Sequence, residues 1–154
     1  MPFDWIRCNE LKYITYTIGN KFQDFFEKLT IEKRQDNKFP LIHEDWADIQ
    51  GTSECTIKNI RYNFVFPHDD IDGFIPKYTR RIERFYDILK NDNIKKIFIR
   101  LSKKDETKEI LELRKCLDIY TKNYDVVTHI YDKNNMFATW KKDEIDWSFI
   151  HKST

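Results

Sequence analysis

The residues best suited to chemistry form a short polar run directly after an apolar, aromatic stretch. His68, Asp69 and Asp70 stand side by side just after Pro67. Imidazole titrates near neutral pH and a neighbouring carboxylate can orient its ring, so this grouping is suited to acid–base catalysis. The apolar stretch before it predicts a buried strand over residues 60–67, which would deliver the polar group to a sheet edge.

A second chemical feature is a basic face on a predicted helix of about 14 residues that follows Pro76. Lys77, Arg81 and Arg84 are spaced at i, i+4 and i+7, with Arg80 beside them, so their side chains project together. Such a face is often simply solvated, but planar guanidinium groups also capture anions well. Both interpretations stay open.

The three cysteines, at positions 8, 55 and 116, form an odd set without C-x-x-C spacing. This pattern indicates reduced thiols in a cytosol-like compartment rather than a disulfide framework, and it argues against a cysteine–histidine zinc site. Cys116 falls inside a predicted helix, where an inert core thiol is expected. We therefore expect no metal and no cofactor.

Composition narrows the class of protein. With 27 Lys and Arg against 26 Asp and Glu, the net charge is +1, which argues against binding duplex nucleic acid through a basic surface. No apolar run approaches the roughly 20 residues of a membrane span, and the first residues do not resemble a signal peptide. We expect a soluble, cytoplasmic protein without membrane contact, in the host cytoplasm if the protein is viral.

The elements that must position these residues begin with a short helix from Asn9, as its N-cap, to Gly19. Apolar side chains at positions 22, 25, 26 and 29 have helical spacing and predict a second short helix with a core-packing stripe. Residues 30–59 show no sustained period and are interpreted as loop-rich covering structure. Trp46, beside acidic groups and a histidine, is either a ligand contact there or an anchored turn residue.

The later elements alternate between strand and helix. The near-continuous apolar centre of residues 94–101 is typical of a parallel strand covered on both faces, and a helix over about 105–120 follows. A strand over 124–132, a turn at 133–135 and a strand over 136–141 then predict an antiparallel hairpin, with a short capping helix over 143–151. The expected fold is one α/β domain over residues 1–154, with a mixed, mostly parallel sheet, flanking helices and this C-terminal hairpin.

A shared edge would bring the chemical residues together. If the strands at 60–67 and 94–101 are parallel neighbours, their carboxyl ends meet at one rim of the sheet, where open α/β sheets bind ligands. His68 and Asp69 would then lie near Arg100 and Ser102.

Several stretches of the chain resemble a known family. They are Pro2-Phe3-Asp4-Trp5-Ile6, Asn20-Lys21-Phe22-Gln23-Asp24-Phe25-Phe26, Phe66-Pro67-His68-Asp69, Tyr78-Thr79-Arg80-Arg81-Ile82-Glu83-Arg84-Phe85 and Ile97-Phe98-Ile99-Arg100. Together they are similar to a domain-of-unknown-function family of bacteria and large DNA viruses, whose members are described as papain-like cysteine peptidases. The resemblance covers most of residues 2–120. It implies a thiol nucleophile with a histidine and a carboxylate, and His68 and Asp69 match the histidine and aspartate of the family.

The nucleophile is where this sequence departs from the family pattern. That pattern places it in a Gly-x-x-Cys segment upstream of the Pro-Phe-Asp-Trp motif, and this sequence has Met1 directly before the motif. Cys8 or Cys55 would therefore have to supply the thiolate. Either thiol would need a lowered pKa or an adjacent base to be activated.

Three functions are therefore open. The first is a cysteine hydrolase or acyltransferase with His68 as base, Asp69 or Asp70 orienting it, and Cys8 or Cys55 attacking a peptide or glycan substrate. The second is a non-catalytic relative that binds a small anionic ligand such as a nucleotide, an RNA end or cap, or a glycan. Its expected contacts are Asp4, Trp5, Trp46, Arg80, Arg81, Arg84, Arg100 and Ser102, with Trp140 or Trp147 as further stacking residues. The third is a protein–protein or assembly module with exposed aromatic side chains.

Overall fold

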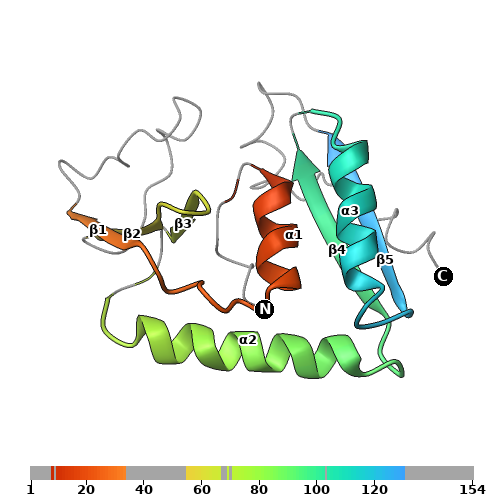
Figure 1. Cartoon of the computed structure of the whole chain (residues 1–154), viewed down its shortest axis with the longest axis horizontal. Coiled ribbons are helices and arrows are strands. Elements are labelled where there is room, and N and C mark those ends of the chain that lie inside the picture. The colour runs from red at the N-terminus through yellow and green to blue at the C-terminus, as the bar shows by residue number, and fades with distance from the viewer. Residues whose placement is uncertain are drawn as a thin grey trace, which may run out of the picture. The chain divides into compact units, whose positions relative to one another are not determined.

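The computed structural model describes residue 8, residues 10–33, 55–66 and 69, and residues 71–102 and 104–130. The chain divides into two compact units, Met1–Asp87 and Ile88–Thr154, and each is described by itself. The first unit contains α1 (Leu11–Gly19), β1 (Leu29–Lys33), β2 (Cys55–Asn59), β3 (Phe64–Phe66) and most of α2 (Phe74–Lys90). The second contains the end of α2, then β4 (Lys96–Ser102), α3 (Thr107–Leu117) and β5 (Tyr124–Ile130) (Figure 1).

The fold is mixed α/β, as predicted, but its sheets differ from the predicted one. Among the described residues, β1, β2 and β3 form an antiparallel sheet in that order, and β4 and β5 form a separate parallel pair. The expectation of a mostly parallel sheet, with residues 60–67 and 94–101 as parallel neighbours, is therefore wrong. The connections account for the pairing within each sheet: the link between β2 and β3, residues 60–63, is too short for a crossover and reverses the chain, whereas the crossover through α3 allows β4 and β5 to be parallel.

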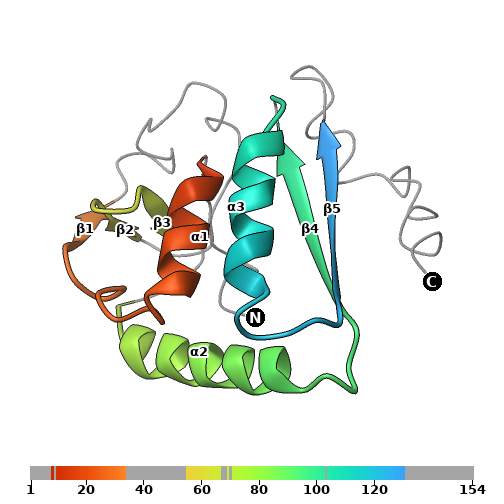
Figure 2. The ribbon, with the colours of Figure 1, turned by 45° about the vertical axis from the view of Figure 1, so that its right-hand side comes forward.

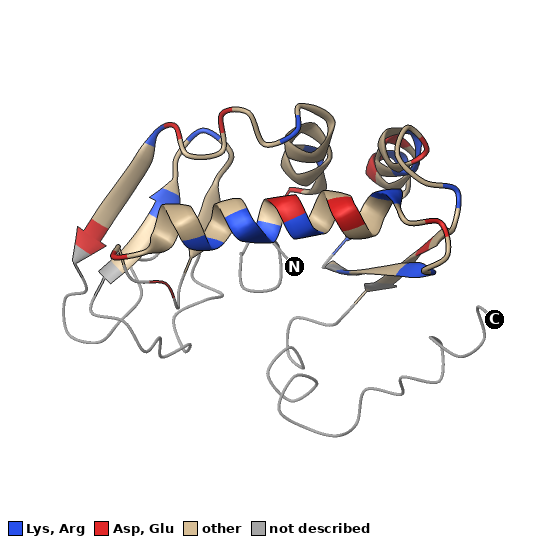
Figure 3. Cartoon of the chain, turned by 90° about the horizontal axis from the view of Figure 1, so that it is seen from below, with Lys and Arg blue, Asp and Glu red and all other residues tan. Residues whose placement is uncertain are grey.

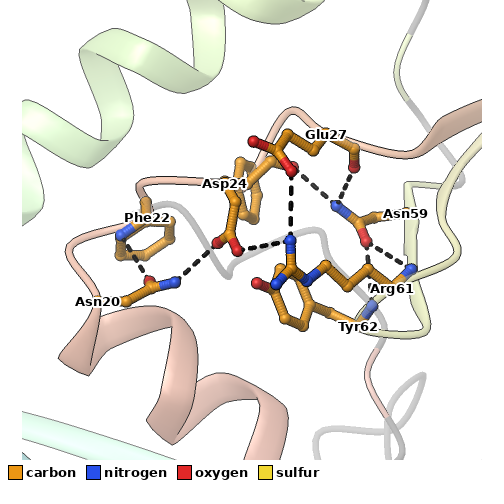
Figure 4. A network of polar contacts seen from close by, with 8 residues as sticks. Asn20, Phe22, Asp24, Glu27, Asn59, Arg61 and Tyr62 are labelled. Carbon is orange, nitrogen blue, oxygen red and sulfur yellow. Dashed lines mark hydrogen bonds and ion pairs between the residues drawn. The ribbon is translucent and has the colours of Figure 1, made fainter.

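The predicted strand over 60–67 is shortened to β3 because the Asn59 side chain closes a turn before it. Its Oδ1 accepts hydrogen bonds from the backbone N–H groups of Arg61 and Tyr62, both at 3.0 Å. Its Nδ2 donates to the carbonyl oxygens of Phe25 and Glu27, at 2.8 and 3.1 Å (Figure 4). Asn59 is fully buried and makes the four hydrogen bonds of which a carboxamide is capable, so it fixes the β2–β3 turn to the chain before β1.

Residues 20–28 form turns rather than the predicted second helix. Lys21 and Phe22 both have a φ of 58°, and Asn20 Oδ1 accepts a hydrogen bond from Phe22 N at 3.1 Å (Figure 4). Left-handed residues cannot continue a right-handed helix, so the chain leaves α1 here. The core-packing interpretation of the same aromatic residues is nevertheless confirmed, because Phe22 and Phe25 are buried.

Two strands lie in the region that was predicted to be loop-rich. β1 and β2 pair with Thr30 opposite Lys58 and Glu32 opposite Thr56, and the Lys58 ammonium forms an ion pair with the Glu32 carboxylate. These charges sit on the face of a short strand, where they obscure the alternation that would have revealed it. Residues 34–54, including Trp46, lie outside the described residues.

The core of the first unit is aromatic. The fully buried Phe25 ring lies between 5.2 and 5.9 Å from five other rings, within the range that aromatic pairs prefer. These rings belong to Phe22, Phe26, Phe64, Phe66 and Tyr78. The chain before β1 is thereby packed against β3 and α2.

Helix α2 begins at Phe74, two residues before Pro76 rather than after it. A proline in the first helical turn is tolerated because the N–H groups there have no partner within the helix. The helical spacing of Tyr78, Ile82, Phe85 and Leu89 predicts one apolar face for this helix, and Tyr78, Phe85 and Leu89 are buried. The Tyr86 hydroxyl donates to the Ile18 carbonyl oxygen at 2.7 Å, which links α2 to α1.

In the second unit, α3 runs along the β4–β5 pair (Figures 1 and 2). Leu113 and Leu117 of α3 are buried, as is Val126 of β5. Ile97 and Ile99 of β4 are 37% and 42% exposed, so the prediction that residues 94–101 are covered on both faces is wrong. The strand predicted over 124–132 is confirmed as β5, whereas its predicted hairpin partner and the helix over 143–151 lie outside the described residues.

Helix α1 has Glu10 rather than Asn9 at its N-cap position, and no side chain caps it there. Within the described ranges, no helix combines the length and the apolar character needed to cross a membrane.

Candidate functional site around Asp69

Asp69, from the predicted histidine–carboxylate group, is the best defined of the candidate site residues. Its side chain is 2% exposed. The Tyr78 hydroxyl donates to Asp69 Oδ2 at 2.6 Å, and the Lys77 ammonium donates to Asp69 Oδ1. A buried carboxylate is stable only when paired and hydrogen-bonded in this way, so both donors are needed to hold Asp69 in place.

Tyr78 connects Asp69 to the aromatic core. The Tyr78 ring is fully buried, with ring centroids 4.7 Å from Phe74, 5.1 Å from Phe66 and 5.8 Å from Phe25. Burial, together with the Asp69 carboxylate beside it, raises the pKa of Tyr78 well above its usual range. Tyr78 is therefore a hydrogen-bond donor to Asp69 throughout the physiological pH range.

Arg81 lies one helical turn beyond Lys77 and completes the cluster. Its guanidinium carbon is 5.1 Å from the centroid of the Tyr78 ring, a cation–π distance. Arg81 is half-buried, and within the described residues its buried Nη1 has no hydrogen-bond acceptor. Asp69, Lys77 and Arg81 together carry two positive charges and one negative charge.

The structure thus divides the arginine face of α2. Arg80 and Arg84 are exposed to solvent, and acidic residues at positions 83 and 87 interrupt the basic run (Figure 3). The predicted face is therefore partly solvated surface and partly, at Lys77 and Arg81, a half-buried cluster with Asp69.

Arg100 and Ser102 belong to the second unit and have local partners. Arg100 Nε and Nη2 donate to the two carboxylate oxygens of Glu106 at 2.7 and 2.9 Å. Burial alone would raise the pKa of Glu106, but the hydrogen-bonded Arg100 guanidinium, with smaller contributions from Ser102 and the Lys104 charge, outweighs burial and the pKa is lowered. Ser102 is buried and accepts a hydrogen bond from Lys104 N at 3.3 Å. Because β3 and β4 belong to different sheets, the predicted rim joining these residues to Asp69 has no basis in strand pairing.

The cysteines have different surroundings. Cys8 is half-buried, and its thiol donates to the Glu10 carbonyl oxygen at 3.2 Å. Cys116 is buried, as predicted, and burial raises the pKa of its thiol. Cys55 is the first residue of β2, opposite Lys33, and its side chain lies outside the described part.

The remaining candidates cannot be placed. Asp4, Trp5, Trp46, His68, Asp70, Trp140 and Trp147 all lie outside the described residues. Among the residues that are described, no three His, Cys, Asp or Glu side chains are grouped so that they could hold a metal ion.

The sequence did not reveal that Lys77 and Tyr78 are the partners of Asp69. Tyr78 was assigned to the apolar face of the helix and Lys77 to its basic face. A weak signal was present, since a tyrosine rather than a phenylalanine at a fully buried position requires a partner for its hydroxyl.

Comparison with known proteins assigns the chain to a family. The chain belongs to the family described as putative papain-like cysteine peptidase, whose model matches residues 1–131, in agreement with the resemblance of its motifs. The chain is also similar to an uncharacterised protein, R408, of Acanthamoeba polyphaga mimivirus. The two are 26% identical over 194 aligned residues, which cover 97% of this chain and 85% of the viral protein. No solved structure matches the chain.

Proposed function

We propose that this chain is a thiol-dependent hydrolase or acyltransferase of papain-like type, with His68 as its general base. The observation that carries the proposal is the burial of Asp69, the residue next to His68, with both of its carboxylate oxygens held by side chains of α2. The proposal takes this anchored Asp69 as the fixed point of the chain beside the general base.

The proposed chemistry is acyl transfer through sulfur. The imidazole takes the thiol proton, the sulfur attacks the acyl carbon of the substrate, and the imidazolium returns the proton to the leaving group. Water or a second nucleophile then cleaves the thioester. Cys8 and Cys55 are the candidate nucleophiles, because Cys116 is buried in the core of its own unit.

In this proposal Asp69 is a positioning residue rather than the carboxylate that orients the imidazole. Each of its oxygens already accepts a hydrogen bond from α2. Along an extended chain, residues i and i+2 point to the same side and neighbours point to opposite sides, so in this proposal Asp70 rather than Asp69 is the candidate to orient His68.

The test measures thiol reactivity and needs no known substrate. Alkylation of each cysteine of the full chain by iodoacetamide is followed by mass spectrometry across pH. We expect Cys8 or Cys55 to react with a midpoint below about pH 7, and His68→Gln to return that midpoint to about 8.5. His129→Gln, which removes a histidine of β5 in the second unit, is the matched control and should leave the profile unchanged.

The alkylation experiment can support or contradict the proposal. A low midpoint that depends on His68 supports an activated thiolate. Ordinary midpoints for both Cys8 and Cys55, unaffected by His68→Gln, would show that no activated nucleophile exists in this chain.

A further inference from the structure

Beyond this proposed activity, and independently of it, we infer that Arg81 is the centre of an oxyanion-binding site on α2. The site would take a phosphate or carboxylate group of a small ligand. The Tyr78 ring contacts the Arg81 guanidinium, and Asp69 accepts hydrogen bonds from both Lys77 and Tyr78.

The first observation is an unused donor. Arg81 Nη1 is buried and has no hydrogen-bond acceptor among the described residues. Nearly all buried polar groups in folded proteins have partners, so this guanidinium N–H calls for an acceptor that the described residues do not supply, and we assign that role to a bound anion. Oxygen atoms of anions are the strongest acceptors for such a donor.

The second observation is a charge imbalance. The single negative charge of Asp69 is matched by the Lys77 ammonium, which donates to it directly. Arg81 then adds a second positive charge, and no carboxylate among the described residues forms an ion pair with it. An added anion would balance the cluster, whereas a neutral ligand would not.

The third observation is that the guanidinium is already oriented. Its carbon lies 5.1 Å from the centroid of the Tyr78 ring, and that ring is locked in the aromatic core. Stacking on a fixed ring limits the orientations of the guanidinium group, so less freedom is lost when it binds an oxyanion.

Three other arginines of the described residues have partners elsewhere. Arg61 pairs with Asp24 and Glu27, and Arg100 pairs with Glu106. Arg114 Nη2 donates to the Val126 carbonyl oxygen at 3.1 Å. Arg80 and Arg84 are exposed, which makes Arg84 a suitable control for Arg81 on the same helix.

The experiment compares inorganic phosphate and acetate, each against sodium chloride at equal ionic strength, by thermal denaturation and calorimetric titration of the full chain. We expect saturable stabilisation of the wild type and of Arg84→Gln. Arg81→Gln should bind at least about tenfold more weakly, and Arg81→Lys, which keeps the charge but not the planar group, should bind with intermediate affinity.

Each arm has a defined meaning. Saturation by phosphate alone assigns a phosphate ligand, such as a nucleotide or an RNA end, and saturation by acetate alone assigns a carboxylate. If Arg81→Gln does not fold, the Arg81 side-chain resonance of the wild type, assigned with Arg81→Lys, is followed by NMR during the titrations. Equal effects on Arg81→Gln and Arg84→Gln, or no saturation by either anion, would show that Nη1 is served by water and would overturn the inference.

Discussion

Asp69 and Lys77 are buried to very different extents, and this makes the pair informative. The Asp69 side chain is 2% exposed and the Lys77 side chain is 39% exposed. Removing Lys77 leaves a carboxylate in the core, whereas removing the charge of Asp69 leaves an ammonium that water can reach.

We expect Lys77→Met to lower the free energy of unfolding by about 3 kcal/mol, because an unpaired buried charge is costly. Asp69→Asn should cost only about 1–2 kcal/mol, since Tyr78 can still donate to the amide oxygen. Urea unfolding measures both, and the double variant should recover part of the loss. A larger cost for Asp69→Asn than for Lys77→Met would contradict this assignment.

Two tyrosines predict the alkaline limit of stability. Burial and the nearby Asp24 carboxylate raise the pKa of Tyr62, and burial and Asp69 raise the pKa of Tyr78. A raised pKa contributes stability that is complete below the unfolded value of about 10 and is lost as the pH rises above it. Tyrosinate absorbance should therefore increase together with unfolding. In Tyr78→Phe this increase in absorbance should correspond to one tyrosine fewer. Ionisation of both rings well before unfolding would contradict their burial.

At the scale of elements, the turn between β2 and β3 depends on Asn63, whose φ is 53°. Asparagine tolerates this left-handed conformation, and a β-branched residue does not. Asn63→Val should cost about 1–2 kcal/mol in urea unfolding, whereas Asn63→Gly should be nearly neutral. Equal stability of the valine and glycine variants would show that the turn can form in another way.

In the second unit, the link from β4 to α3 depends on the Arg100–Glu106 pair. The Glu106 side chain is 3% exposed, so Arg100→Met should cost about 3 kcal/mol at pH 7. The lowered pKa of Glu106 contributes stability that is present above the unfolded value of about 4.3 and is lost as the pH falls below it. The stability of the variant should therefore fall less between pH 7 and pH 3.

Lys115→Met is the control, because its partner Glu112 is 62% exposed and the pair is a surface contact. Such pairs contribute at most about 0.5 kcal/mol, so this variant should keep the wild-type stability and acid dependence. If the two variants behave alike, the burial of Glu106 has no energetic consequence.

At the scale of the whole molecule, the two compact units raise the question of how the chain unfolds. Arg100 and Glu106 lie within the second unit, so Arg100→Met should speed amide hydrogen exchange in residues 96–130 more than in residues 55–85. Equal acceleration throughout would show one cooperative unit, as the prediction of a single domain over residues 1–154 requires.

The sequence predicted elements with a long, regular period and missed those set by single side chains. Helices α2 and α3 and strands β4 and β5 follow from apolar spacing. The turn at 20–28 was missed because helical spacing of the aromatic residues does not reveal the left-handed conformations of Lys21 and Phe22, and the sheet pairing was wrong because apolar spacing does not specify which strands pair. At the site, Asp69 and Arg81 were predicted, but the donors to Asp69 were not, since a bond from Tyr78 across a turn leaves no periodic signal.

The anchoring of Asp69 also bears on how related sequences should vary. Selection for folding alone is enough to retain an aspartate that holds the start of α2 in the core, whereas the proposed role of His68 is chemical. Among relatives that have given up chemistry, the histidine should therefore drift while the aspartate, the lysine and the tyrosine persist as a set. An intact His-Asp dipeptide is then evidence of activity only through its first residue.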